Sequence, residues 1–340
     1  MSARLMAAAG QCWEQLTATL LSPTADFSVF SLLSAFLIAA CFVTLSREKR
    51  TGLRVLVRAL LPRRWLKSRS ARADLGLLAI NTFVSATLVG WAIVSAAAVE
   101  QFLGHRLDLL FGTATPFTVS RPVMTAILTV SFYLAYELAY FVDHYLSHHI
   151  PLLWHFHKVH HTAETLSPAT NYRVHPIDSL VFYNIAAVCI GSATALASHL
   201  FAAPGAPFST GGTNAILLIT TYLLTHLHHS HMWIAFTGKL GRIVLSPAHH
   251  QLHHSSDPAH FNRNFGNTLA LFDHLAGTLK VPTREREKLV FGGGPMAYDP
   301  HGVSGLLIRP FADATASLGL TLERPHAEPK LAPNRPSSHT

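Results

Sequence analysis

The sequence predicts an all-α integral membrane protein, with about four to five transmembrane helices and a cytoplasmic helical cap that carries histidine-rich motifs. The chain of 340 residues is 49% hydrophobic and only 13% charged, with a mean hydropathy of +0.29. These values are too apolar for an ordinary soluble domain. Several long runs also lack charged residues, and a run of about 20 apolar residues is long enough to cross the hydrocarbon core as a helix.

The first expected span is the charge-free run Phe27–Leu45. The preceding 26 residues combine short apolar runs with scattered charges, so we expect no removable signal peptide. From Arg47 to Arg72 there are ten Lys or Arg residues and one acid, Glu48. A basic stretch between two apolar runs predicts a cytoplasmic loop near anionic lipid rather than a nucleic-acid surface. Residues 1–120 are therefore expected to anchor the chain, with a basic loop at 47–72.

Four further spans are expected, at Leu75–Val99, Pro122–Val142, Ser179–His199 and, in part, Asn214–Thr225. If the basic loop is cytoplasmic, alternation of the spans brings the ends of the third and fifth spans to the cytoplasmic face. The third span contains Glu137. An acid at that depth must be paired or must face the protein interior. It either orients a nearby imidazole or makes a hydrogen bond between packed helices, and we favour the second interpretation.

The 23 histidines are strongly concentrated, with eight between His144 and His175 and nine between His226 and His260. Residues three or four apart share one face of a helix. Three sets follow this spacing, one HxxxH and two HxxHH motifs: His144 with His148, His157 with His160 and His161, and His250 with His253 and His254. Neutral imidazole binds iron, zinc, copper or nickel, and eight convergent rings provide ligands for two metal ions. The alternative is a histidine patch without metal.

Other polar residues near these motifs leave alternatives open. His226 and His229 are three apart at the end of the fifth span and could complete the ligand set, whereas His175 and His231 are further candidates. Arg173 either binds a charged head group or pairs with Asp178, and we favour the pairing. Residues 321–340 contain four prolines and few large apolar residues, which predicts a disordered tail.

At these motifs the chain resembles the fatty acid hydroxylase and sterol desaturase superfamily, the membrane-bound oxygenases with histidine boxes. The flanking segments agree: PLLWHFHKVHH from Pro151, NYRVHP from Asn171, SPAHHQLHHSSDPAH from Ser246 and NFGNTLALFDHLAGT from Asn264. The resemblance covers about residues 120–310, which implies a catalytic domain at 121–310.

The resemblance implies a non-haem di-iron centre that uses dioxygen to hydroxylate or desaturate a lipid such as a fatty acyl chain or a sterol. No catalytic residue is expected beyond the metal ligands. The implied ligands of the two iron ions are His144, His148, His157, His160, His161, His226, His229, His250, His253 and His254. The chain contains no HExxH motif, which removes the commonest zinc-protease helix.

The resemblance also implies partners and a location. The substrate is expected to come from the bilayer, and electrons from a separate ferredoxin, cytochrome or reductase, since only a short cap and tail follow the motifs. No nucleic acid is expected. We favour the bacterial inner membrane, with the histidine motifs on the cytoplasmic side. The competing hypothesis is a histidine-rich metal-binding or transport protein of the membrane, without oxygenase activity.

Overall fold

The computed structural model describes residues 2–46, 52–61, 67–90, 94–112, 117–201, 205–294 and 296–319. The expected tail at 321–340, and residues 47–51 and 62–66 of the expected basic loop, lie outside the described residues. The described structure is mostly helical, as predicted.

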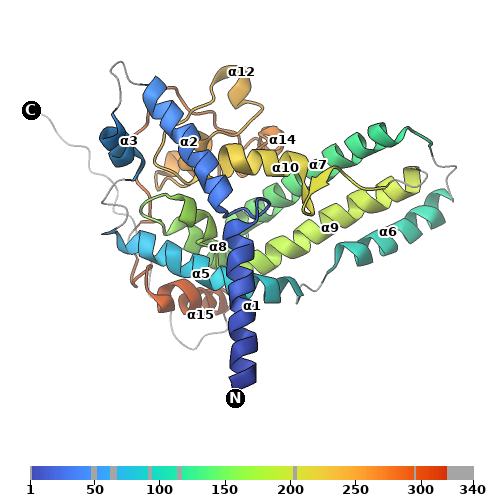
Figure 1. Cartoon of the computed structure of the whole chain (residues 1–340), viewed down its shortest axis with the longest axis horizontal. Helices are drawn as coiled ribbons and strands as arrows, with labels where there is room; N and C mark the ends of the chain where they lie inside the picture. Colours follow the sequence, from blue (N-terminus) through green and yellow to red (C-terminus); the bar gives the residue numbers. More distant parts are fainter. Residues whose placement is uncertain are drawn as a thin grey trace, which may run out of the picture.

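Two long helices form the centre of an elongated bundle. They are α7 (Arg121–His149) and α9 (Pro176–Leu200), and α6 (Ala96–Phe111) packs along α9 (Figure 1). Among the described helices, α7 and α9 are the ones that are both long and apolar enough to cross a membrane. Gly191 allows the close approach of α6 and α9, because a Cβ at this position would lie 2.5 Å from the carbonyl oxygen of Ala96. Small residues commonly permit such close packing of membrane helices.

The other expected spans take different forms. The first becomes α2 (Val29–Leu45), which has 17 residues, and the fifth is an apolar helical stretch, Ala215–His228. Both are shorter than the run of about 20 residues that usually crosses a membrane. The charge-free run at 75–99 does not form one helix, because α5 (Arg69–Gly90) ends within it and α6 begins at Ala96. The predicted count of four to five crossings therefore stays a prediction.

Of the remaining elements, α1 is a helix of 20 residues and the others are shorter. At the start of the chain, α1 (Ser2–Leu21) extends away from the other helices, and α3 (Leu53–Leu60) follows α2 (Figure 1). The strands β1 (Ser209–Thr210) and β2 (Thr213–Asn214) pair antiparallel and lead into the apolar stretch. That stretch consists of α10 (Ala215–Thr220), the π-turn η2 (Thr221–Thr225) and α11 (His226–His228). The other short elements are η1 (Pro168–Tyr172), α12 (Gly238–Gly241), α13 (Pro247–His253), η3 (Pro258–His260), α14 (Leu271–Ala276), η4 (Ser304–Ile308) and α15 (Arg309–Ser317). The predicted cap stays a prediction.

The helix α8 (Pro151–His161) carries the first HxxHH motif, and a buried arginine makes hydrogen bonds to its C-terminal end. Arg173 has no exposed surface, and its guanidinium pairs with the equally buried Asp74 of α5 at 2.9 Å. The same guanidinium donates to the carbonyl oxygen of Val159 and to the hydroxyl of Thr162, at the end of α8. Our expected pairing of Arg173 with Asp178 is therefore wrong, because an acid 99 residues earlier in the chain reaches the arginine instead.

Candidate metal centre

Nine of the ten predicted ligands gather in two clusters of imidazoles. We call them cluster 1, which consists of His144, His148, His157, His161 and His253, and cluster 2, which consists of His160, His229, His250 and His254. Within each cluster the potential ligand nitrogens all lie within 4.8 Å of one another. All nine side chains are buried except that of His148, which is half-buried. The two clusters are neighbours, because the rings of His161 and His254 stack with centroids 4.6 Å apart.

Each HxxHH motif serves both clusters rather than a single point. The residues four apart share a cluster: His157 with His161 in cluster 1, and His250 with His254 in cluster 2. The third member of each motif, His160 or His253, belongs to the opposite cluster. Successive residues of an α-helix are separated by a rotation of about 100°, so adjacent histidines cannot point at one centre. Each motif therefore contributes two rings to one cluster and its third ring to the other cluster.

The Nε2 atoms of cluster 2 converge on one another. That of His229 lies 3.0 Å from His160, 2.8 Å from His250 and 3.1 Å from His254. The Nε2 atoms of His250 and His254 are 3.1 Å apart. An Nε2 atom that lacks a proton carries a lone pair, and several lone pairs that face each other at this distance repel unless a cation lies between them.

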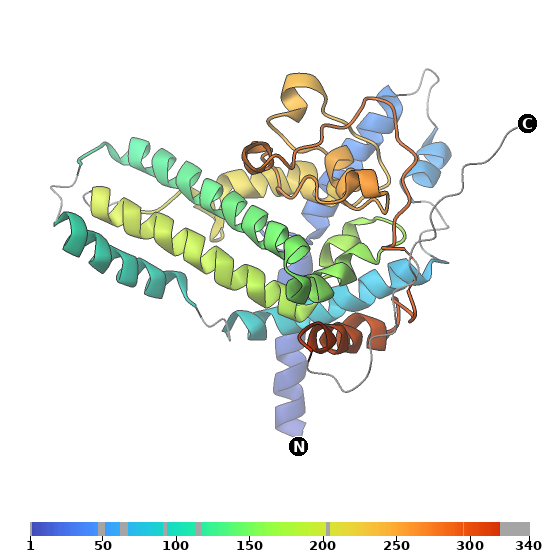
Figure 2. The same cartoon turned by 180° about the vertical axis from the view of Figure 1, so that it is seen from behind.

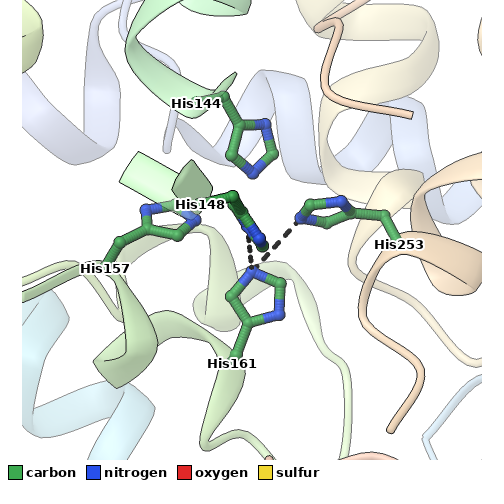
Figure 3. Close-up of side chains that lie close together, drawn as sticks. All are labelled: His144, His148, His157, His161 and His253. Carbon is green, nitrogen blue, oxygen red and sulfur yellow. Dashed lines mark hydrogen bonds between the residues drawn. The ribbon is translucent and has the colours of Figure 1, made fainter. Parts of the chain in front are cut away.

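Cluster 1 has the same character (Figure 3). The Nε2 atom of His161 lies 3.1 Å from that of His148 and 3.2 Å from that of His253. The Nε2 atoms of His144 and His157 are buried and have no hydrogen-bond partner within the described parts of the chain. Figure 3 shows the five rings directed toward a common centre from three separate segments of the chain.

These distances fit a metal ion in each cluster. Metal–imidazole bonds of about 2.1 Å put neighbouring ligand nitrogens roughly 3.0–3.4 Å apart, for octahedral or tetrahedral geometry. The shortest Nε2–Nε2 separations are 2.8–3.2 Å. The donor set is all nitrogen, which suits iron, zinc, copper or nickel but not magnesium or calcium.

Burial keeps the rings in the protonation state that metal binding requires. It lowers the pKa of His253 to about 3, and burial together with repulsion between neighbouring rings lowers the pKa of His250 and of His254 well below the ordinary value. Imidazole binds metal as the neutral form. At neutral pH these rings are therefore available as ligands without the loss of a proton.

The opposite edges of the cluster 1 rings are held by acceptors. Nδ1 of His144 donates to the carbonyl oxygen of Phe265, and Nδ1 of His253 donates to that of Arg263, each at 2.8 Å. Nδ1 of His157 donates to the carboxylate of Asp178 at 3.1 Å. Such partners fix the tautomer and direct Nε2 toward the metal. Three of the five cluster 1 rings are therefore oriented before any ion binds.

The loop that holds His144 and His253 is itself braced. Its residue Asn264 has a positive φ of 58°, which asparagine tolerates better than most residues. The backbone N–H groups of Phe265 and Gly266 donate to the two carboxylate oxygens of Asp273, at 2.8 and 2.7 Å. This loop was missed by the sequence reasoning as a source of ring partners, although it lies inside the NFGNTLALFDHLAGT segment.

Comparison with known proteins agrees with this geometry. The family of fatty acid hydroxylases matches residues 129–278, a range that contains every residue of both clusters. This segment, 150 of the 340 residues, is similar to fatty acid hydroxylases. The resemblance seen in the sequence is therefore confirmed.

Three curated proteins that are similar to part of this chain are named as lipid hydroxylases or monooxygenases. The ornithine lipid hydroxylase OlsE of Rhizobium tropici is 32% identical over 134 residues, which are 39% of this chain and 35% of that protein. The alkylglycerol monooxygenase of Xenopus tropicalis is 28% identical over 146 residues, 42% of this chain and 28% of that protein. The human alkylglycerol monooxygenase is 26% identical over 143 residues, 42% of this chain and 28% of that protein. The chain thus spans about a third of the length of these relatives, and no solved structure matches it significantly.

Three predicted or possible ligands lie outside the two clusters. His226 donates through Nε2 to the carbonyl oxygen of Asp26 at 2.7 Å and contacts the hydroxyl of Ser31 at 3.0 Å. His175 accepts from the backbone of Ile177 and donates to that of Leu307, so both its nitrogens are engaged. His231 also belongs to neither cluster. The structure thus places His229 in cluster 2, whereas His226, three residues earlier, belongs to neither cluster.

Two acids near the clusters have roles that differ from one another. Glu137, in α7, accepts from the backbone of Thr268 and Leu269 at 3.0 and 2.8 Å. Glu137 therefore makes packing hydrogen bonds, as favoured, but its partners belong to the loop before α14 rather than to a second helix; within the described residues none of these bonds goes to a histidine. Asp178 instead holds the ring of His157. The sequence offered one indication of this role, because Asp178 lies in the first turn of an apolar helix that follows a histidine motif.

A cavity of about 510 Å³ lies against the metal centre, and we call it the α7–α9 cavity. The metal-centre side of its wall is formed by His144 and His157 of cluster 1 and His160 of cluster 2. The rest of the wall is mostly aromatic and polar, from α7, α9, η1, α10 and the loop before α2: Thr24, Ala25, Asp26, Tyr136, Tyr140, Asp143, Asn171, Val174, Asp178, Ser179, Phe182, Tyr183, Thr213 and Leu217. A molecule in this cavity would contact both clusters.

Proposed function

We propose that this chain is a membrane-bound lipid hydroxylase that holds one iron ion in each histidine cluster and uses dioxygen. The observation that carries the proposal is the convergence of nine imidazoles into two adjacent buried clusters, in a domain of the fatty acid hydroxylase family. The irons supply dioxygen activation and attack on an unactivated C–H bond, chemistry that side chains alone do not perform. We leave His226 out of the proposed ligand set because its ring nitrogen is bonded to Asp26 and Ser31.

The protein's own contribution is binding, orientation and exclusion of water. Eight of the nine rings are buried, which keeps bulk water from the centre. The carbonyl and carboxylate acceptors on the opposite ring edges keep three of the five cluster 1 imidazoles in position. The α7–α9 cavity would present one carbon of the substrate to both clusters. We favour hydroxylation over desaturation because the relatives are named hydroxylases or monooxygenases.

Hydroxylation with dioxygen also consumes electrons and protons and releases water. We therefore propose a separate electron donor, such as a ferredoxin, cytochrome or reductase. We further propose that the centre faces the cytoplasm of a bacterial inner membrane. Supporting this orientation, Ser70, at the end of the basic stretch, accepts from the backbone N–H of Glu164, just after α8, and basic stretches favour the cytoplasmic side.

The first test is elemental analysis of the detergent-purified chain, expressed with iron. We expect about two irons per polypeptide, one for each cluster. His157→Ala in cluster 1 and His250→Ala in cluster 2 should each lower bound iron and abolish lipid oxidation. His149→Ala is the matched control, because this ring follows His148 directly but bonds only the carbonyl oxygen of Tyr145 at 2.7 Å and lies outside both clusters.

Unchanged iron and activity in both cluster variants would refute the assignment. The alternative of a metal transporter predicts uptake of metal ions into vesicles, and a single bound zinc ion would point to a different site chemistry. Transport is the weaker hypothesis, because the cluster histidines of α7 come only from its last turns, His144 and His148, and α9 contributes none. In Figure 2 the C-terminal end of α7, the helix α8 and the start of α9 lie together at one end of the long helices.

A further inference from the structure

The α7–α9 cavity has an acidic lining without a compensating cation. Three of its lining residues are carboxylic acids, Asp26, Asp143 and Asp178, and none of the described lining residues is a lysine or arginine. The whole chain has a net charge of +8. Apart from histidines, however, the ionisable groups with a charge at neutral pH that line this cavity are acids. This arrangement favours a positively charged group in the bound molecule.

Asp143 is the carboxylic acid that is free to bind such a group. The residue is only 9% exposed, and its Oδ1 is buried with no hydrogen-bond partner in the described structure. Asp178 differs, because its Oδ2 already accepts from His157. A buried carboxyl oxygen without a hydrogen-bond partner is unfavourable. A donor on a molecule in the cavity would remove that cost.

Aromatic rings line the same cavity as this acid, both on its own helix α7 and on α9. Tyr136 and Tyr140 of α7 and Phe182 of α9 all line the cavity. The ring of Phe182 packs edge-to-face against both tyrosines, with centroids 5.9 and 6.2 Å apart. Ring faces attract cations, and the attraction grows when water is excluded. A carboxylate beside such a wall suits an ammonium group and would repel a phosphate or carboxylate.

Asp26 is the second acid that could bind a cation in the cavity, and His226, a histidine outside the clusters, holds its backbone. His226 bonds the carbonyl oxygen of Asp26, and its ring packs edge-to-face against Phe27, with centroids 5.8 Å apart. The loop that carries Asp26 is thereby fixed to the end of α11. This contact explains a buried histidine that serves no cluster.

We propose that the α7–α9 cavity binds the ammonium group of an amine-bearing lipid, with Asp143 as its main anionic partner. The inference rests on the proposed function, since it assigns the cavity to the substrate. Asp143 and the metal ligands His144 and His157 line the same cavity. The oxidised carbon therefore lies in or near the amine-bearing head group rather than at the far end of an acyl chain.

The test compares three lipids: an ornithine lipid with its free amine, the same lipid N-acetylated, and an alkylglycerol. Their equilibrium binding to the iron-loaded protein in nanodiscs is measured without an electron donor. The ornithine lipid should bind at least about tenfold more tightly than the other two, because both leave the buried carboxylate unpaired. Asp143→Asn should reduce this preference to about twofold or less. Asp108→Asn should preserve it, because Asp108 is a half-exposed acid of α6 that pairs with His199 outside the cavity.

Equal binding of the free and acetylated lipids by the wild-type protein would overturn the proposal, and this comparison needs no variant to fold. An unchanged preference in Asp143→Asn would also overturn it. Supplying dioxygen and a chemical reductant separates the two proposals. An amine preference without oxygen insertion would leave the cavity assignment standing and refute the hydroxylase, whereas equal oxidation of all three lipids would do the reverse. Fragmentation of the product by mass spectrometry should place the new oxygen on the head group.

Discussion

The buried pair of Arg173 and Asp74 should be one of the strongest single determinants of stability near the metal centre. Both side chains have no exposed surface. The guanidinium also donates to Val159, Thr162, Ser70 and Pro300, which joins the end of α8 to α5 and to the segment before η4. Removal of one partner of a buried pair leaves the other charge uncompensated and typically costs about 3–5 kcal/mol.

We therefore expect Arg173→Ala to lower the melting temperature of the detergent-purified protein by roughly 6 °C or more, at about 2 °C per kcal/mol for a larger domain. The variant should also lose iron, because α8 carries three of the nine clustered histidines. Asp74→Ala combined with Arg173→Ala should cost less than the sum of the single changes, since no unpaired charge remains. Melting temperature is measured by intrinsic fluorescence, and iron by mass spectrometry.

The matched control is Arg69→Ala. Arg69 pairs with Asp299, but the two side chains are 66% and 43% exposed, and exposed pairs contribute only about 0–1 kcal/mol. If Arg173→Ala shifted the melting temperature no more than Arg69→Ala, the idea that the buried pair holds α8 in place would be wrong.

Two further predictions concern residues around the clusters. Asp178→Ala should weaken iron binding about 10–100-fold, because His157 loses the acceptor that orients its ring; titration against a chelator measures this, and unchanged affinity would remove the proposed role of Asp178. His226→Asn should retain iron whereas His229→Ala should lose it, because His229 alone of these two lies within a cluster; equal iron loss in the two variants would return His226 to the ligand set.

The sequence was sufficient for the parts of the site that depend on helical periodicity. The i, i+4 pairs predicted from spacing do share clusters, as His144 and His148 illustrate. Spacing could not predict that His229 joins a cluster and His226 does not. A π-turn ends just before His226 and the helical stretch ends just before His229, so regular helical geometry does not relate the two side chains. The ring acceptors were also beyond local reasoning. Phe265 contacts a histidine 121 residues earlier, and such contacts are set by tertiary packing alone.

Hydropathy likewise measures how apolar a run is and not whether it stays one helix. The run at 75–99 has no charged residue, yet its helix ends at Gly90 and another begins at Ala96, capped by the hydroxyl of Ser95. Helix α5 instead begins within the basic stretch and buries Asp74 against Arg173. The sequence thus predicted one membrane span at 75–99, where the structure has the end of α5 and the start of α6.

The HxxHH spacing itself implies two adjacent centres rather than one. Residues four apart differ by about 40° around a helix and can reach one ion, whereas adjacent residues differ by about 100°. A helix with histidines at i, i+3 and i+4 must therefore direct either its middle or its last ring elsewhere. When two such helices face each other, as α8 and α13 do here, each ring that is directed away from its own pair reaches the pair of the other helix. The stacked rings of His161 and His254 mark the boundary where this exchange occurs. The rotation of the helix thus explains why one ring of each motif leaves its own pair, whereas the tertiary placement of α8 and α13 decides which cluster receives that ring.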